Sequence, residues 1–186
     1  MDLETAIQAF ARAGNDLPRE AMQWTLDHWD EAAPELLSVL ERYTSGADRS
    51  DEAARAVLFI LHLAGEKKDT RVFSLLCRLA QDGEAVEAAL GDGTTITLKQ
   101  ILISTYDGNL DTLKGLIEAA EVDEFVRAGA LQVLAYLTAT GRIPREETHP
   151  SRRDGGLPAR ALRHAATPAG ELCVERLGAG HRAARP

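Results

Sequence analysis

Apolar residues recur at helical spacing through the first four-fifths of the chain, and the pattern then stops. Up to Thr148 they follow the i, i+3, i+4, i+7 rule of amphipathic helices. From His149 onward, proline and glycine interrupt every window in which such a period could continue. The sequence therefore predicts a helical domain over residues 1–148 and an irregular Arg/Ala/Gly/Pro-rich tail over residues 149–186, which we expect to be disordered.

The helical part reads as a series of paired helices. Capping residues, prolines and glycines predict where the helices begin and end. In the first half of the chain we expect helices over 3–13, from 17 onward, from a cap at Asp30 to 45, from a cap at Ser50 to Gly65, and from a cap at Asp69 to 79. In the second half we expect helices over 84–90, 97–106, 109–120 and 123–140, and a last helix that starts at Pro144. Second helices of the pairs start near residues 34, 69, 109 and 144, which is the spacing of two-helix solenoid units. We expect an all-α fold, a HEAT-like α–α superhelix of antiparallel helix pairs.

Composition and charge narrow the functional classes. Aromatic residues make up 5% of the chain, and the abundance of Leu and Ala favours helix-on-helix packing. Residues 1–148 hold 14 Lys and Arg against 26 Asp and Glu, a net charge of −12, whereas residues 149–186 carry a net charge of +4. An acidic body repels phosphate backbones, so we expect no nucleic-acid partner. It suits a protein partner with a basic or helical segment.

The two cysteines and the N-terminus indicate no special compartment. Cys77 lies among leucines and Cys173 lies in the tail, so the two do not form a close pair with metal or redox spacing. The chain has no run of 18 apolar residues, and its start lacks the basic and apolar regions of a signal peptide. We expect a cytoplasmic protein without a membrane segment.

Two groups of polar residues are candidate sites. The loops between the units of a solenoid often line one face of it. We therefore expect a binding group formed by the polar loop residues Asp92, Thr95, Asp107 and Asn109. The turn at Gly91–Gly93 lacks the lysine of a phosphate-binding loop. The second group lies beside Trp24 and Trp29 and comprises Asp27, His28, Asp30 and Glu31. Its carboxylates and imidazole are components of metal sites and of acid–base sites.

The second group also has a simpler interpretation, as charge and capping around the start of a helix. His28 and Glu31 have i, i+3 spacing, but no second histidine pair accompanies them. His62 lies in an apolar stretch, where a hydrogen-bonded packing role is commoner than a ligand role. We therefore predict no catalytic residue, metal or cofactor, and keep as the alternative a metal-dependent hydrolase with a carboxylate/histidine site between repeats.

Several stretches within residues 59–148 carry a family resemblance, and they include RVFSLL (71–76), ILISTYDGN (101–109), RAGAL (127–131) and GRIPREE (141–147). These stretches resemble an uncharacterised bacterial family of HEAT-like helical proteins, domain-of-unknown-function family 1186. Members of that family look as though they continue with aromatic helices and often a Cys- and His-rich SEC-C zinc motif. This chain departs from the family there, which implies that it lacks any zinc site of the family. Because the family has no assigned activity, the resemblance implies a fold and little more.

The tail has the composition of GC-rich coding sequence read out of phase. Back-translation of residues 162–186 with free synonymous codons, shifted one base forward, yields the segment FAWSGWAQAIARLG, which is similar to what the family has next. We expect the C-terminal part of the family to be lost or frame-shifted here, and the truncated stack to be open to self-association through its uncapped end. The sequence as a whole predicts a non-enzymatic scaffold for protein–protein interaction.

Overall fold

The computed structural model describes residues 1–14 and 16–148, and within them every regular element is helical. The elements are α1 (Leu3–Ala11), α2 (Arg19–Asp27), α3 (Trp29–Thr44), α4 (Asp51–Lys67), the 3₁₀ turn η1 (Thr70–Val72), α5 (Phe73–Gln81), α6 (Gly83–Leu90), α7 (Gly93–Ile96), α8 (Leu98–Thr105), α9 (Leu110–Glu118), α10 (Glu124–Ala139) and α11 (Arg145–Thr148). The all-α prediction is confirmed, and the predicted tail lies outside the described residues.

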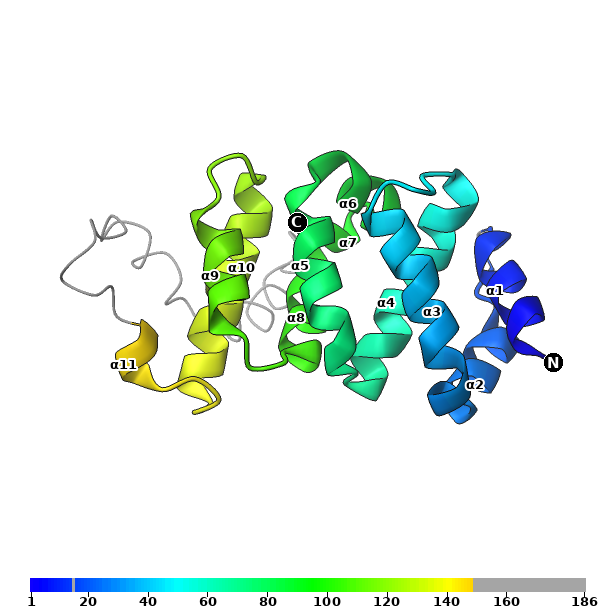
Figure 1. Ribbon diagram of the computed structural model, residues 1–186, viewed down its shortest axis with the longest axis horizontal. Helices are drawn as coiled ribbons and strands as arrows, with labels where there is room; N and C mark the ends of the chain where they lie inside the picture. The colour runs from blue at the N-terminus through cyan, green and yellow to red at the C-terminus, as the bar shows by residue number, and fades with distance from the viewer. Residues whose placement is uncertain (15, 149–186) are drawn as a thin grey trace, which may run out of the picture. The chain divides into compact units, whose positions relative to one another are not determined.

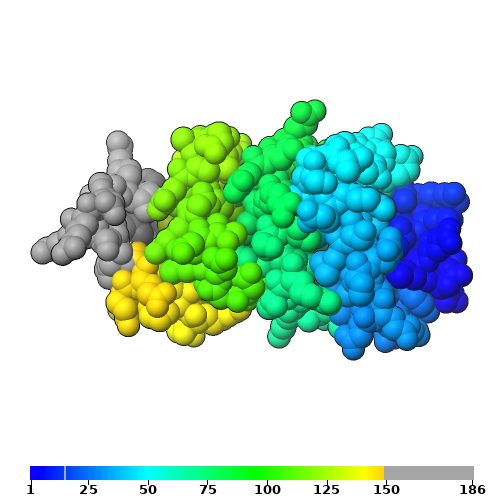
Figure 2. Space-filling model, in the orientation of Figure 1, coloured from blue at the N-terminus to red at the C-terminus, as the bar shows by residue number. Residues whose placement is uncertain are grey.

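The helices pack in two rows (Figure 1). In the front row α3 contacts α5 and α5 contacts α9, while in the rear row α1 contacts α4, α4 contacts α8 and α8 contacts α10. Each front helix also packs on a rear helix, as α3 does on α4 and α9 on α10. Figure 2 shows the side chains of α3, α5 and α9 filling the spaces between the ribbons on this face. None of the described helices combines the length and apolar character that a membrane span requires.

Helix α4 lies at the centre of the packing and contacts α1, α2, α3, α6 and α8. The ring of Phe59 on α4 stacks on that of Phe10 on α1, with 5.3 Å between the ring centroids. On the front row, the buried hydroxyl of Tyr43 donates to the carbonyl oxygen of Ala85 at 2.9 Å. One buried apolar cluster therefore extends from α1 to α10 and joins the helix pairs.

Most of the predicted caps mark the start of a helix. The Ser50 hydroxyl accepts from the amide of Ala53 at 3.2 Å, and the Asn109 side chain accepts from the amide of Thr112 at 3.1 Å. Asp123 caps α10 in the same way. These side chains satisfy amides that the first turn of a helix leaves without a partner, which is why the sequence marks these positions well.

The predicted cap at Asp30 is wrong. Helix α3 begins one residue earlier, at Trp29, and the carbonyl of His28 already accepts from the amide of Ala32 at 3.0 Å. Burial of the Trp29 ring, which is 5% exposed, fixes the backbone there, so Asp30 lies within the first turn. Pro34 lies inside the helix on its exposed side.

The predicted end of a helix at Gly65 is also wrong, because α4 continues to Lys67. The residue with left-handed backbone is Lys68, with φ of 54°. Gly65 lies instead where α4 meets α8: a Cβ atom built on it would be 3.6 Å from the branched carbons of Ile101. Its small size serves the contact between helices, and a stop signal was the wrong interpretation of this glycine.

Candidate functional site

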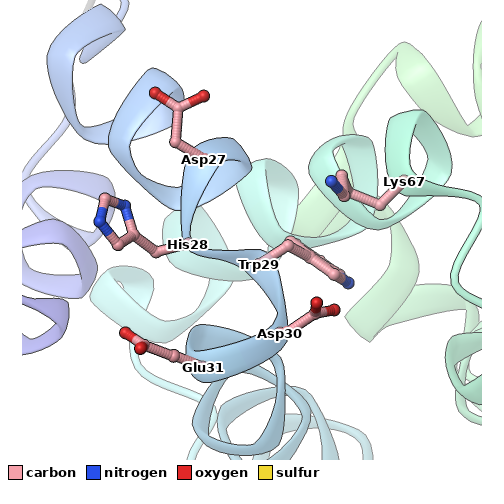
Figure 3. A pocket seen from close by; sticks show the side chains of 6 residues that line it. All are labelled: Asp27, His28, Trp29, Asp30, Glu31 and Lys67. Carbon is pink, nitrogen blue, oxygen red and sulfur yellow. The ribbon is translucent and has the colours of Figure 1, made fainter.

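The junction between α2 and α3 surrounds a hollow of about 240 Å³ (Figure 3). Only His28 separates the two helices, so consecutive side chains fan out around the bend. The hollow is lined by Asp27, His28, Trp29, Asp30, Glu31 and, from the end of α4, Lys67. The candidate group at residues 27–31 is thus brought together, as one acidic edge around an indole.

Trp29 is held in place by a residue forty positions later in the chain. Its indole N–H donates to Asp69 Oδ2 at 2.9 Å. The same carboxylate accepts from the guanidinium of Arg71, with Nε 2.9 Å from Oδ1, and from the Arg71 amide. These bonds, that of Arg71 above all and then that of Trp29, lower the pKa of Asp69 from its ordinary value against the effect of burial. The rigid Trp29–Asp69 link fixes the base of the hollow.

His28 is engaged by its own helix. Its Nδ1 lies 2.9 Å from the carbonyl oxygen of Trp24, and its ring stacks on the Trp24 ring with centroids 4.6 Å apart. Because a carbonyl only accepts, Nδ1 carries the proton in this arrangement. The imidazole covers the side of Trp24 and is turned away from Asp30 in Figure 3.

The carboxylates around the hollow diverge. In Figure 3 those of Asp27, Asp30 and Glu31 point in three directions and do not converge on one point. Asp27 Oδ1 accepts from the side-chain Nε2 of Gln23 at 2.9 Å. Within residues 1–14 and 16–148, no group of three or more His, Cys, Asp or Glu side chains could hold a metal ion. The arrangement presents negative charge over a broad edge.

The binding group predicted from the loops divides into two pairs. Thr95 Oγ1 donates to the carbonyl of Asp92 at 3.0 Å in the turn before α8. Beyond α8, Asp107 accepts from the amide of Asn109 at 2.8 Å, and Asn109 caps α9. The eight residues of α8, about 12 Å of helix, separate the pairs. All four side chains are exposed, and their role in binding stays a prediction.

The lone histidine and cysteine in the apolar stretches of the chain have packing roles. His62 Nδ1 lies 2.7 Å from the carbonyl oxygen of Leu58, as the predicted hydrogen-bonded packing requires. Cys77 is 1% exposed, and burial raises the pKa of its thiol to about 12. Neither side chain lines the hollow between α2 and α3.

Sequence reasoning missed two residues of the candidate site, Lys67 and Asp69. Both come from the end of α4 and the turn after it, about forty positions from the residues that they meet. Asp69 was marked only as a cap, a role that it does have for η1. No local pattern reports that a capping carboxylate also accepts a bond from a distant indole, so only the packing of α3 on α4 and α5 reveals the link.

Comparison with known proteins gives the same family over all the described residues. A family model described as "Protein of unknown function (DUF1186)" matches residues 1–149. The chain belongs to this family. The resemblance found in residues 59–148 is confirmed and extends through the N-terminal helices and the α2–α3 junction.

Relatives of this DUF1186 protein occur in chlamydiae. An uncharacterized protein of Chlamydia trachomatis is 26% identical over 149 residues, which make up 78% of this chain and 59% of the relative. An uncharacterized protein of Chlamydia muridarum is 25% identical over 148 residues, with the same coverage. The chain thus matches less than two thirds of the length of these relatives. No solved structure matches it.

Proposed function

We propose that this DUF1186 protein is a non-enzymatic, HEAT-like α-solenoid scaffold whose acidic surface binds a protein partner through a basic, helical segment. The order of contacts supports the solenoid, because consecutive helix pairs supply each other's apolar interface along both rows. Such an arrangement leaves the outer sides of the helices free for recognition, and stacked-helix proteins use these extended surfaces to bind partners.

The observation that carries the proposal is the unneutralised acid at the α2–α3 junction. Asp30, Glu31 and Glu35 are exposed, and no cation of the described residues forms an ion pair with them. Elsewhere on the front row Glu41 is neutralised, since Arg78 on α5 lies 2.9 Å away. Three exposed carboxylates outside the ion pairs thus lie together on the first turns of α3, next to the hollow.

The hollow gives this acidic edge a shape that a basic side chain fits. A lysine or arginine stem can lie over the part of Trp29 that lines the hollow, with its charged end at the acidic edge that Asp27, Asp30 and Glu31 form. Lys67 lies on the opposite wall, with Nζ 3.4 Å from the carbonyl of Leu26, and it favours approach from the α3 side. Attraction of this kind steers association and weakens as salt rises.

The test is retention of partners from an extract of the source organism on the immobilised full-length chain. We expect a protein with a basic helical segment to be retained at low salt and released as ionic strength approaches ~1 M, where the Debye length falls to about 3 Å. The variant Asp27→Asn/Asp30→Asn/Glu31→Gln should bind the identified partner at least ~10-fold more weakly, about 1.4 kcal/mol.

The matched control removes three exposed carboxylates far from the hollow: Glu84→Gln/Glu87→Gln/Glu118→Gln. It changes the net charge by the same amount and should bind the partner as the wild type does. Equal losses of affinity in both triple variants would show that the interaction depends on net charge and not on a site at the α2–α3 junction. The proposal would be contradicted if the wild type and both triple variants retained the same proteins, or if none of these three chains retained any protein.

A further inference from the structure

Helix α10 presents an apolar stripe that the described helices leave exposed, apart from Lys99 of α8, whose Nζ donates to Gln132 Oε1 at 3.3 Å. Its inner side is buried, whereas its outer side carries exposed residues at i, i+3, i+7, i+10, i+11 and i+14, which share one face of a helix: Phe125, Ala128, Gln132, Ala135, Tyr136 and Ala139. Gln132 is the single polar member. Phe125 is 61% exposed and Tyr136 is 50% exposed, so the two aromatic rings project from the ends of the stripe.

A stripe of this extent is unusual on a protein surface that has no partner. Isolated exposed apolar residues are ordinary, but a contiguous face of two aromatic rings and three alanines marks an interaction site. With ~150–250 Å² for each aromatic side chain, about half of it exposed, and the alanines added, the stripe offers roughly 400–500 Å². Pairing two such faces would bury on the order of 1,000 Å², the lower end of specific interfaces.

The order of large and small residues along the stripe is self-complementary. When two copies of α10 are placed antiparallel with a two-fold axis at Gln132, residues equally far from position 132 face each other. Phe125 then faces Ala139 of the second copy, Tyr136 faces Ala128, and Ala135 faces Gly129. Every aromatic ring meets a methyl group, and the small residues near the centre allow the backbones to approach closely.

We infer that the α10 stripe is a self-association surface, through which two copies of this chain form a weak, antiparallel, two-fold symmetric dimer. The contact is apolar, and each copy carries a net charge of −8, so repulsion between copies opposes it. Salt therefore strengthens the dimer, whereas it weakens binding of a basic partner at α2–α3. The opposite responses to salt separate this inference from the proposed function, on which it does not rest.

Sedimentation equilibrium of the full chain tests the surface. The apparent mass should rise from 20.1 kDa towards twice that value over roughly 10 µM to 1 mM, and the rise should be steeper at high salt. Phe125→Lys should weaken association at least tenfold. Leu17→Lys makes the same kind of change at a residue that is 55% exposed, between α1 and α2, and should leave association unchanged.

A disulfide tests the two-fold axis. In a Cys173→Ser background, with Cys77 buried, Gln132→Cys should form a covalent dimer under mild oxidation, because residue 132 meets its own copy at the axis. Leu17→Cys should not. A chain that remains monomeric at all concentrations would overturn the inference. This holds both for a stripe that other residues of the chain protect from solvent and for a stripe that is open to solvent. A dimer that Phe125→Lys leaves intact, or one that crosslinks equally at position 17, would overturn it too.

Discussion

At the scale of single residues, Asp69 connects more of the structure than any other described carboxylate. It receives the indole N–H of Trp29 and both side-chain and backbone N–H groups of Arg71. Its side chain is 7% exposed, so the charge is stabilised by these donors in place of water. Loss of the charge would loosen the base of the hollow from the turn after α4.

The link predicts a pH-dependent contribution to stability. Because the pKa of Asp69 is lowered by folding, its stabilising effect is present above the ordinary value of 3.8 and is lost as the pH falls through the lowered value. Asp69→Asn should lower the free energy of unfolding at pH 7 by about 1–2 kcal/mol, since hydrogen bonds to a charged group are lost.

Urea unfolding followed by circular dichroism at pH 7 and near pH 3 measures this effect. The stability difference between Asp69→Asn and the wild type should shrink at the lower pH, because below the ordinary pKa of 3.8 the carboxyl group of the unfolded wild-type chain binds a proton and the stabilising effect declines. Asp48→Asn is the control, because the pKa of this half-buried aspartate is also lowered but its side chain binds only the nearby Ser50. An Asp69→Asn difference that is the same at both pH values would contradict the role of the charge.

At the scale of elements, α4 meets α8 at a glycine within a helix. Glycine costs up to about 1 kcal/mol relative to alanine in a helix interior. At Gly65 an added Cβ would lie 3.6 Å from the side chain of Ile101, an ordinary van der Waals distance. The packing of the two helices therefore leaves space for one methyl group and for little more.

Substitutions at Gly65 test this spacing. Gly65→Ala should raise the free energy of unfolding by about 0.5–1 kcal/mol, because it restricts the unfolded chain and fits the contact. Gly65→Leu should lower it by about 1–3 kcal/mol or more through overpacking against Ile101. Gly115→Ala in α9, where nothing lies within 4 Å of the new methyl group, gives the propensity effect alone. Thermal unfolding of the three variants measures these changes in stability. If Gly65→Ala destabilised the protein while Gly115→Ala stabilised it, α4 and α8 would lie closer together than described.

The sequence predicts elements well where the signal is local and less well where it depends on packing. Ser50, Asn109 and Asp123 marked true helix starts because each cap acts on an amide two or three residues away. The predictions at Asp30 and Gly65 are wrong because they depend on distant parts of the chain. Burial of Trp29 sets the start of α3 near Asp30, and Ile101 approaches Gly65 from α8. The one-turn helix α7 has no periodic signal, and the sequence did not predict it.

The candidate site shows the same division. Residues 27–31 could be grouped from their order alone, because they are consecutive, but Lys67 and Asp69 could not be added to them. The loop group of Asp92, Thr95, Asp107 and Asn109 was built on the assumption that successive loops share a face. The length of α8 instead places its two halves at opposite ends of that helix.

At the scale of the whole helical unit, consecutive helices of the rear row cover each other, α1 on α4, α4 on α8 and α8 on α10. Both the acidic junction on the front row and the stripe on α10 take their positions from this packing. If the rear row were arranged differently, neither surface would have the form described.

Methyl and aromatic nuclear Overhauser effects in the full-length chain test this packing most directly. We expect effects between the Gly65 Hα protons and the Ile101 methyl groups, and between the rings of Phe10 and Phe59 and of Phe73 and Tyr106, whose centroids are 5.3 and 5.2 Å apart. Ile101 methyl groups that show effects to helices other than α4, and none to Gly65, would contradict the two-row arrangement.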